Sequence, residues 1–360
     1  MIRRHPDTGR APLRVYFLQG NEHVATIRDV ARHAGVGVGT ASRVISGRGP
    51  VSSETAARVN AAIEVLGFRP SEIARALSSM STGLVGVYVP DFHGAFYGPF
   101  LQTISDELRA CHRRMVVANG FGDGDGRTQV MDGLEFLIER ECDGIIVFTN
   151  RLQDDDFHTI HRKQPRLAII NREVPGLEEN CFSVDHRSGG ELAADALLSH
   201  GHRRIAVITG PDIAVDNTWR LDGFFAVLAE NGIQRDSVPQ RDGSFSFEGG
   251  WAAIEHFINE GVTFTGLFCA NDEMAMGAMS CLQEHGVRVP LDVSVVGYDN
   301  TVLSGFTSPR LTSVAIPMSE MAANGCRWLL NQCFGTSLEV HRSFSIDVAW
   351  RASVVDCPRQ

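Results

Sequence analysis

From residue 83 onward, short apolar runs alternate with longer amphipathic stretches, and this alternation restricts the fold more than any other feature. The runs are rich in Val and Ile and are hydrophobic throughout, instead of alternating with polar residues. Continuous apolar strands separated by helices are typical of parallel sheets that helices cover on both faces. The predicted strands are 84–89, 114–119, 144–148, 166–171, 204–209, 266–270 and 293–299.

The composition is typical of a globular protein without a membrane-spanning part. The 360 residues suffice for two or three domains, and 43% of them are hydrophobic against 21% charged. No apolar stretch approaches the ~20 residues that a membrane helix needs. The amino-terminal sequence MIRRHPDTGR is basic and lacks the apolar core of a secretory signal. We therefore expect a cytoplasmic protein with no membrane partner.

Signatures of catalysis and metal binding are missing from the sequence. The eight cysteines are scattered, with no CxxC pair and no zinc-ligand spacing, which favours reduced thiols. The segment FGDGDG, 121–126, has GxGxG spacing, and its two Asp residues would repel phosphate. No nucleophile elbow or catalytic dyad stands out. We expect no enzyme activity, no metal and no cofactor.

Charge divides the chain into a basic part and an acidic part. Residues 1–82 contain eleven Arg and six Asp or Glu, a net charge of +5. The remaining 278 residues hold 22 basic and 37 acidic side chains, a net charge of -15. This asymmetry indicates a basic module that binds a polyanion, joined to an acidic body that does not.

The segment that begins at Thr26 has the spacing of three short helices. Thr26 starts a T-x-x-D capping box, Gly35 ends the first helix, a second is predicted over 38–46, and Ser52 or Ser53 caps the third. The predicted buried positions are Ile27, Val30, Ala31, Ala34, Ala56, Val59, Ala62, Ile63 and Leu66. Two short helices about a glycine turn, closed by a third, are typical of a helix-turn-helix DNA-binding module. An ordinary three-helix bundle is the alternative, and the basic charge favours the DNA-binding module.

These residues resemble the DNA-binding head and hinge of the LacI/GalR repressors. The resemblance rests on ATIRDVARHAGVGVGTASRVISG and VSSETAARVNAAIEVLGFRPSEIARALSS, and it extends over about residues 25–350. It implies that the second helix lies in the major groove of double-stranded operator DNA. The DNA contacts that it implies are Thr26, Val38, Gly39, Thr40, Ser42, Arg43, Ala74 and Leu77.

Two glycines depart from the family pattern at the predicted DNA-reading helix. Gly37 stands where the family usually has a Ser that donates to phosphate. Gly39 costs the helix ~1 kcal/mol relative to Ala and offers no side chain to a base. Direct readout then falls mainly on Arg43, which can bond a guanine edge bidentately, and on Val38, which can contact a thymine methyl. We expect a half-site with fewer directly read bases than a typical relative has.

The segment SEIARALSS, 71–79, matches the family hinge, which becomes helical when two subunits meet on DNA. Leu77 matches the leucine that enters the minor groove and bends the duplex. From the residues alone, burial statistics favour a core position for Leu77. Residues 1–24 precede the resemblance, and we expect a disordered arm or an over-extended start site there.

For the remainder, the resemblance implies an α/β body of two doubly wound parallel-sheet subdomains of periplasmic-binding-protein type, behind an all-α helix-turn-helix head. The chain is expected to cross between the subdomains near Val184, Val314 and Arg342. The predicted domains are an extension (1–24), a DNA-binding domain (25–70), a hinge (71–82) and a body (83–350), with an N-subdomain at about 83–184 and 315–342 and a C-subdomain at about 185–314 and 343–355.

Polar and aromatic residues follow several predicted strands, where ligands of such folds bind. The predicted effector contacts are Phe96, Tyr97, Asn171, Arg172, Arg220, Phe245, Asn271 and Asp299. Asp and Asn can accept from vicinal hydroxyls, Arg can donate, and aromatic rings can cover the C–H face of a sugar. Each polar residue alone could equally cap a helix or turn, but their convergence at successive strand ends favours a cleft.

The resemblance as a whole implies a repressor of carbohydrate-utilisation genes that a small sugar releases from DNA. The body is most similar to galactose-responsive members, through AFYGPF, LAIINREVPG, GHRRIAVI and ANDEMAMGAM, so we expect a galactose-like hexose or galactoside. The alternatives are a ligand that acts as co-repressor, or a sugar-binding sensor or transport-type protein without effective DNA binding. The carboxyl-terminal AWRASVVDCPRQ has no leucine heptad, so we expect a homodimer.

Overall fold

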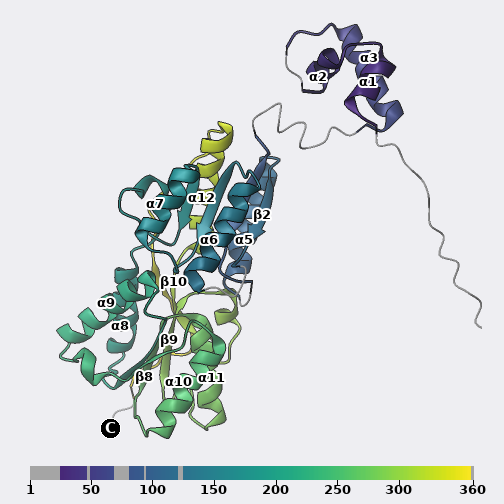
Figure 1. The fold of residues 1–360 in the computed structure, drawn as a ribbon. Coiled ribbons are helices and arrows are strands. Elements are labelled where there is room, and N and C mark those ends of the chain that lie inside the picture. Colours follow the sequence, from purple (N-terminus) through teal and green to yellow (C-terminus); the bar gives the residue numbers. More distant parts are fainter. Residues whose placement is uncertain (1–24, 47–48, 69–80, 93–94, 121–124, 358–360) are drawn as a thin grey trace, which may run out of the picture. The chain divides into compact units, whose positions relative to one another are not determined.

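The computed structural model of the chain consists of two compact units, residues 1–81 and 82–360, and each is described by itself (Figure 1). The described residues are 25–46, 49–68, 81–92, 95–120 and 125–357. The predicted extension and the hinge residues Ala74 and Leu77 lie outside them, so those expectations stay predictions. Within the described ranges, no helix is long and apolar enough to cross a membrane.

The described residues of the first unit form three helices, α1 (Ile27–Ala34), α2 (Val38–Ser46) and α3 (Ser53–Leu66). Its apolar core is small. The core residues are Val30, Ala31, Ala34, Ala41, Val59 and Ala62. The other positions predicted to be buried are half-buried, namely Ile27, Ala56, Ile63 and Leu66. The three-helix prediction for this segment is confirmed.

Local hydrogen bonds set the ends of these helices. The Thr26 hydroxyl accepts from the backbone N–H of Asp29 at 3.4 Å, and the Asp29 carboxylate accepts from the backbone N–H of Thr26 at 3.0 Å. Gly35 ends α1 in the left-handed conformation, with a φ of 64°, which glycine adopts at low cost. Of the two candidate caps for α3, Ser52 accepts from the backbone N–H of Thr55 at 3.3 Å.

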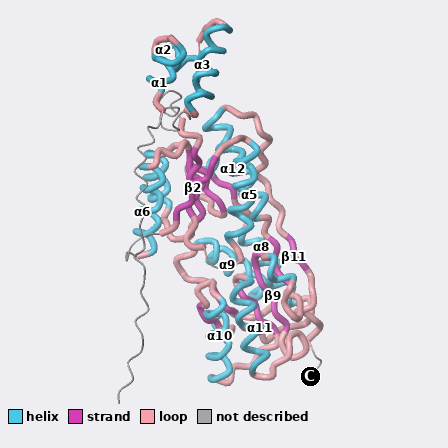
Figure 2. The backbone as a smooth tube through the Cα atoms, turned by 90° about the vertical axis from the view of Figure 1, so that its right-hand side faces the viewer, coloured by secondary structure: helices cyan, strands magenta, loops and turns pink. Residues whose placement is uncertain are grey.

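The first sheet of the body has five parallel strands in the order β2-β1-β3-β4-β5. The strands are β1 (Leu84–Tyr88), β2 (Arg114–Ala118), β3 (Gly144–Phe148), β4 (Leu167–Ile170) and β5 (Cys181–Phe182). Helices α5 (Tyr97–Ala110) and α12 (Met318–Phe334) cover one face, and α6 (Gly126–Glu139) and α7 (Asp154–Lys163) cover the other. In Figure 2, α5 and α12 lie on one side of β2 and α6 lies on the other.

Side-chain alternation along β1 accounts for the two helical layers. Val85 and Val87 are buried in one apolar cluster with Phe100 of α5, whereas Tyr88 is buried in another with Leu134 of α6. A strand that is covered on both faces needs apolar side chains at successive positions. The uninterrupted hydrophobic runs of the sequence reflect this requirement.

The second sheet has six strands in the order β11-β10-β9-β8-β6-β7, all parallel except β11, which pairs antiparallel with β10. The strands are β6 (Ile205–Thr209), β7 (Gln240–Asp242), β8 (Gly266–Cys269), β9 (Ser294–Asp299), β10 (Thr312–Ala315) and β11 (Asp347–Ala349). Helices α8 (His186–Leu198) and α9 (Val215–Glu230) pack in one cluster, and α10 (Phe247–Asn259) and α11 (Asp272–Glu284) pack in another.

All seven predicted strands are present, each end within one residue of the expected one. Four short strands, β5, β7, β10 and β11, were not predicted. They lack a continuous apolar run: β7 is Gln-Arg-Asp, and β10 begins with Thr312 and Ser313. On β10 the buried Ser313 hydroxyl donates to the Asp272 carboxylate at 2.6 Å. Such strands take their place through tertiary hydrogen bonds that hydropathy does not reveal.

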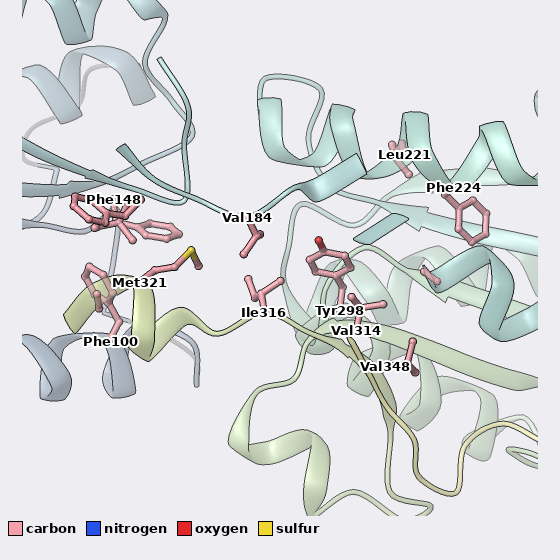
Figure 3. Packing of buried hydrophobic residues seen from close by; sticks show 14 of the residues in the cluster. Phe100, Phe148, Val184, Leu221, Phe224, Tyr298, Val314, Ile316, Met321 and Val348 are labelled. Atoms are coloured by element: carbon pink, nitrogen blue, oxygen red, sulfur yellow. The ribbon is translucent and has the colours of Figure 1, made fainter. Parts of the chain in front are cut away.

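The chain passes between the two sheets three times, after β5, after β10 and before β11. Val184 and Ile316 lie on the first two segments, in one apolar cluster that continues from Phe148 to Val348 (Figure 3). On the third segment, Arg342 donates to the carbonyl oxygen of Cys181 at 3.1 Å. One continuous core therefore joins the two subdomains of the body.

Candidate functional site

Helix α2 carries the side chains that the sequence predicts to read DNA. Val38 is 45% exposed, and Gly39 and Arg43 are also exposed. Thr40 and Ser42 are half-buried on the same helix. These five residues are therefore accessible enough to contact a partner, whereas the small side chains of the core hold the helix in place.

The two glycines of this segment are not required by packing. A Cβ atom built on Gly37 or Gly39 would meet no other atom within 4 Å. Gly49 differs, because its φ is +87° and a Cβ there would lie 3.4 Å from Cδ of Arg43. An alanine at position 39 would therefore meet no other part of the head.

A cavity of about 520 Å³ lies between the two subdomains of the body, within the usual size range of small-molecule sites. Seven of the eight predicted effector contacts line it, namely Phe96, Tyr97, Asn171, Arg220, Phe245, Asn271 and Asp299. Lining residues that the sequence analysis missed include Asp91, Phe148, Arg151, Asp216, Glu248 and Glu273. The wall is thus assembled from the carboxyl ends of strands in both sheets, where doubly wound folds bind ligands.

Arg172 is the predicted contact that does not line this cavity. Its guanidinium donates to the Asp154 carboxylate at 2.7 Å, and its side chain is buried. It lines a small recess beside the cavity, together with Asn171 and Asp216. The structure therefore places Arg172 behind the wall and not in it, because Asp154 of α7 draws the guanidinium toward its own helix.

Three aromatic rings form one side of the cavity. Phe96 lies 5.2 Å from Tyr97 and 5.6 Å from Phe148, and Tyr97 lies 5.4 Å from Phe148, all edge to face between ring centroids. Burial raises the pKa of Tyr97 well above its ordinary value, so its hydroxyl stays protonated. Phe148 is the last residue of β3. Its position at a strand end was the signal that could have identified it.

Backbone strain is concentrated at this cavity. Seven non-glycine residues in the described part of the chain have positive φ, and four of them line the cavity. These four are Asn171 (62°), Ser244 (51°), Phe245 (56°) and Asp299 (101°). Such conformations cost about 1–3 kcal/mol each and persist where the surrounding structure holds them, often at functional sites.

Arg220 of α9 is held on several sides in the cavity wall. It is 2% exposed, its Nη2 atom lies 3.3 Å from Oδ2 of Asp216, and its Nη1 atom donates to the carbonyl oxygen of Ala270. Its Cζ atom lies 3.6 Å from the centroid of the Tyr298 ring, a cation–π contact. Nε has no hydrogen-bond partner among the described residues. The guanidinium is a pre-positioned donor.

Asn271 combines a structural role with its place in the wall. Its Oδ1 atom accepts from the backbone N–H of Met274 at 2.9 Å and so caps α11. Its Nδ2 atom donates to the carbonyl oxygen of Phe245 at 3.2 Å. Asn271 therefore fixes both the start of α11 and the loop that carries Phe245.

Carboxylates outnumber guanidiniums in the wall. The charged lining residues are Asp91, Asp216, Glu248, Glu273 and Asp299 against Arg151 and Arg220. Burial raises the pKa of Asp299 well above its ordinary value, and it also raises the pKa of Glu273. Both shifts favour the neutral acid, because burial disfavours a charged group in this cavity.

A helix-turn-helix unit with an exposed second helix, on one chain with a two-subdomain body and a polar cavity, defines a ligand-regulated DNA-binding protein. Residues 26–71 match the family model described as bacterial regulatory proteins, lacI family, and residues 194–354 match the periplasmic binding protein-like domain. The chain belongs to the LacI/GalR family of transcriptional regulators. The predicted family and fold class are confirmed.

Individual relatives resemble the chain over most of its length. The HTH-type transcriptional regulator GalR of Escherichia coli is 33% identical over 332 residues, which cover 92% of this chain and 96% of that protein. The crystal structure of a LacI-family regulator from Burkholderia phymatum is 48% identical, with a TM-score of 0.75 over 76% of this chain and 99% of its own. The lac repressor dimer bound to operator and the anti-inducer ONPF has a TM-score of 0.79 at 27% identity, over 92% and 99%.

Proposed function

We propose that this protein is a dimeric repressor that a small, uncharged saccharide releases from its operator. The observation that carries the proposal is the cavity between the subdomains, in which an aromatic wall faces fixed polar side chains. Rings that stack on C–H faces and side chains that bond hydroxyls are the two parts of a saccharide site. The family membership supplies the link from such a site to DNA.

The DNA-binding surface is proposed to be α2 and the hinge. Arg43 and Val38 would read base edges, while Thr26, Gly39, Thr40 and Ser42 would lie against the duplex backbone and the groove. Ala74 and Leu77 of the hinge would enter the minor groove between two subunits. The net charge of +5 over residues 1–82 supports this assignment, as does the operator complex of the lac repressor. The chromosome is in the cytoplasm, where we place the protein.

The charge balance of the cavity narrows the ligand class. Because burial disfavours charged groups in this cavity, and acidic side chains outnumber guanidiniums in its wall, a sugar phosphate or a uronic acid is disfavoured. A neutral hexose or glycoside meets no such barrier. A galactose-like sugar is the favoured candidate because the body resembles galactose-responsive members of the family.

A homodimer is supported by an exposed apolar cluster beside β9. The segment η3 (Val302–Gly305) and the next residue expose Val302 by 61%, Leu303 by 43% and Phe306 by 82%. Large apolar side chains gathered at a surface are typical of an interface. We propose that this cluster contributes to the contact between two copies of the chain.

In this proposal, saccharide binding closes the cleft and shifts the subdomains, which disorders the hinges and weakens operator binding. The energetic coupling must be reciprocal, since both ligands bias one two-state element. The ligand could instead act as a co-repressor. An inducer weakens operator binding, whereas a co-repressor tightens it, so the sign of the coupling distinguishes the two roles.

The proposal is tested by fluorescence anisotropy of the full-length protein against a library of palindromic duplexes, repeated with a panel of neutral, acidic and phosphorylated saccharides. We expect tight binding to one duplex, a steep decrease with salt, and release by one neutral sugar. Tighter binding with sugar would identify a co-repressor. Sugar binding without specific duplex binding would identify a sensor whose head Gly37 and Gly39 have impaired.

A further inference from the structure

His186 joins the two subdomains of the body through side-chain hydrogen bonds. It is the first residue of α8, directly after the first crossing segment, and is 1% exposed. Its Nε2 atom lies 3.0 Å from Oδ1 of Asn171, which follows β4 in the first subdomain. Its Nδ1 atom lies 3.1 Å from the hydroxyl of Tyr298, on β9 in the second subdomain. The Tyr298 ring in turn faces the guanidinium of Arg220 at 3.6 Å.

The chemistry of these partners fixes the direction of each hydrogen bond. A neutral imidazole has one donor and one acceptor nitrogen, and a carbonyl oxygen can only accept. Since the Asn171 partner atom is Oδ1, Nε2 of His186 must donate, and Nδ1 must then accept from the Tyr298 hydroxyl. Burial in this site and the nearby Arg220 lower the pKa of His186 well below its ordinary value, which keeps the ring neutral.

This arrangement determines what Asn171 offers to the cavity. With Oδ1 bonded to His186, the remaining polar atom of the amide is Nδ2, which has two N–H donors and no acceptor among the described residues. Asn171 lines the cavity and has a φ of 62°. The amide therefore presents donors, and not its oxygen, to a ligand.

The packing around His186 holds it closely to both partners. A Cβ atom on Gly189, one turn along α8, would lie 2.2 Å from the Tyr298 hydroxyl, so only glycine leaves space for that hydroxyl. A Cβ atom on Gly190 would lie 1.8 Å from the carbonyl oxygen of Arg220, so α8 and α9 are in backbone contact. The helix that carries His186 and the helix that carries Arg220 therefore form one rigid pair.

We propose that His186 is a specificity-determining positioning residue, which orients the Asn171 amide as a donor to a saccharide oxygen and connects it through Tyr298 to Arg220. This inference rests on the proposed function, because it names how that cavity selects among hydroxyl patterns. His186 itself does not line the cavity and acts through Asn171.

The test compares His186→Phe, which keeps a ring but no hydrogen bonds, with His186→Gln, which keeps one donor and one acceptor. Calorimetry of the full-length protein with D-galactose and its monodeoxy analogues measures affinity and hydroxyl discrimination together. We expect His186→Phe to bind D-galactose about 10- to 100-fold more weakly and His186→Gln to recover most of the loss. The matched control is His202→Gln, at a buried histidine that bonds Thr265 and the Val355 carbonyl instead.

Two further results separate positioning from a general loss of structure. The double variant His186→Phe/Asn171→Ala should bind D-galactose no more weakly than Asn171→Ala alone, because both substitutions remove one donor. For the hydroxyl that Asn171 recognises, the wild type should bind the corresponding deoxy analogue more weakly than D-galactose. His186→Phe should bind that analogue and D-galactose with similar affinity. Additive losses, or unchanged discrimination among the analogues, would overturn the inference.

A ligand-free measurement keeps this inference distinct from the proposed function. In ¹⁵N-histidine NMR spectra of the wild type, we expect His186 to be the neutral Nε2–H tautomer throughout pH 6–8. An Nδ1–H tautomer or a charged ring would contradict the assigned orientation of Asn171. If no saccharide of the panel binds the wild type while the Nε2–H tautomer is observed, the proposed function fails and the orientation stands.

Discussion

The backbone N–H of Ala95 donates a 2.9 Å hydrogen bond to Oε1 of Glu273, which joins the loop after β1 to the first turn of α11 across the cavity. Ala95 belongs to the first subdomain and Glu273 to the second. The bond therefore spans the cleft whose closure the proposed mechanism requires.

Glu273→Ala should weaken saccharide binding about 5- to 30-fold by removing this bond, since the closed cleft then becomes less populated. Operator affinity without saccharide should not decrease, because a less populated closed cleft leaves more of the protein in the operator-binding state. Calorimetry and anisotropy measure the two quantities. Glu284→Ala, at an exposed glutamate of the same helix, is the control. Equal saccharide affinity in both variants would mean that the Ala95–Glu273 hydrogen bond does not stabilise the closed cleft.

Arg43→Ala should abolish the preference for operator over random duplex, because Arg43 is the one long donor side chain among the proposed reading residues of α2. Anisotropy with both duplexes measures the ratio. The control is Glu64→Ala, at an exposed position of α3 outside the proposed DNA contacts, which should keep the preference. A preserved operator preference in Arg43→Ala would mean that other residues read the bases.

Arg220→Ala and Asp299→Asn should each lower saccharide affinity at least about 30-fold while operator binding persists. Asn is used at position 299 because it tolerates the φ of 101° better than Ala does. The readout is saccharide-induced release of operator. Asp222→Ala, at an exposed position of α9, should respond as the wild type. A normal sugar response in both cavity variants would refute the pocket assignment.

Phe306→Glu should dissociate the dimer, because a charge replaces an apolar side chain that is 82% exposed in the single chain. Sedimentation velocity should show a monomer at concentrations where the wild type is dimeric. Saccharide binding by the monomer should survive, since Phe306 is not part of the cavity wall. A dimer of unchanged stability would place the interface elsewhere.

The buried carboxyl group of Asp272 should make the stability of the protein depend on pH. Desolvation raises its pKa to about 6, although Ser313 and Thr301 donate to its carboxylate. A carboxyl group with a raised folded-state pKa stabilises the fold fully below its unfolded pKa, and this contribution disappears as the pH rises through about 6. Asp272→Asn does not titrate and also lacks one acceptor oxygen.

The stability deficit of Asp272→Asn relative to the wild type should therefore be larger at pH 4.5 than at pH 7.5. Urea unfolding of both proteins at the two pH values measures the difference. A deficit that grows with pH would mean that the folded state prefers the charged carboxylate.

The fold was predictable where its causes are local in sequence. The capping box of Thr26 and Asp29 depends on residues three apart, and a strand such as 144–148 is marked by its own hydrophobicity. Strand β7 and the buried Ser313 hydroxyl of β10 depend on partners distant in sequence, so their polar residues gave no signal.

The cavity was predictable where a residue follows a strand end, as Asn171 and Asn271 do. Asp216 was missed although it stands four residues before Arg220, a spacing that places both on one helix face. His186 was missed because its partners are 15 and 112 residues away. Arg172 follows a strand end as well, and only the position of Asp154 explains why it turns behind the wall.

The central claim, that the cavity and the DNA-reading helix are coupled, is tested most directly by titrating the releasing saccharide into the free protein and into its operator complex. Saccharide should bind the complex more weakly than the free protein, by the same factor by which saccharide weakens operator binding. Identical saccharide affinity in the two titrations would contradict it.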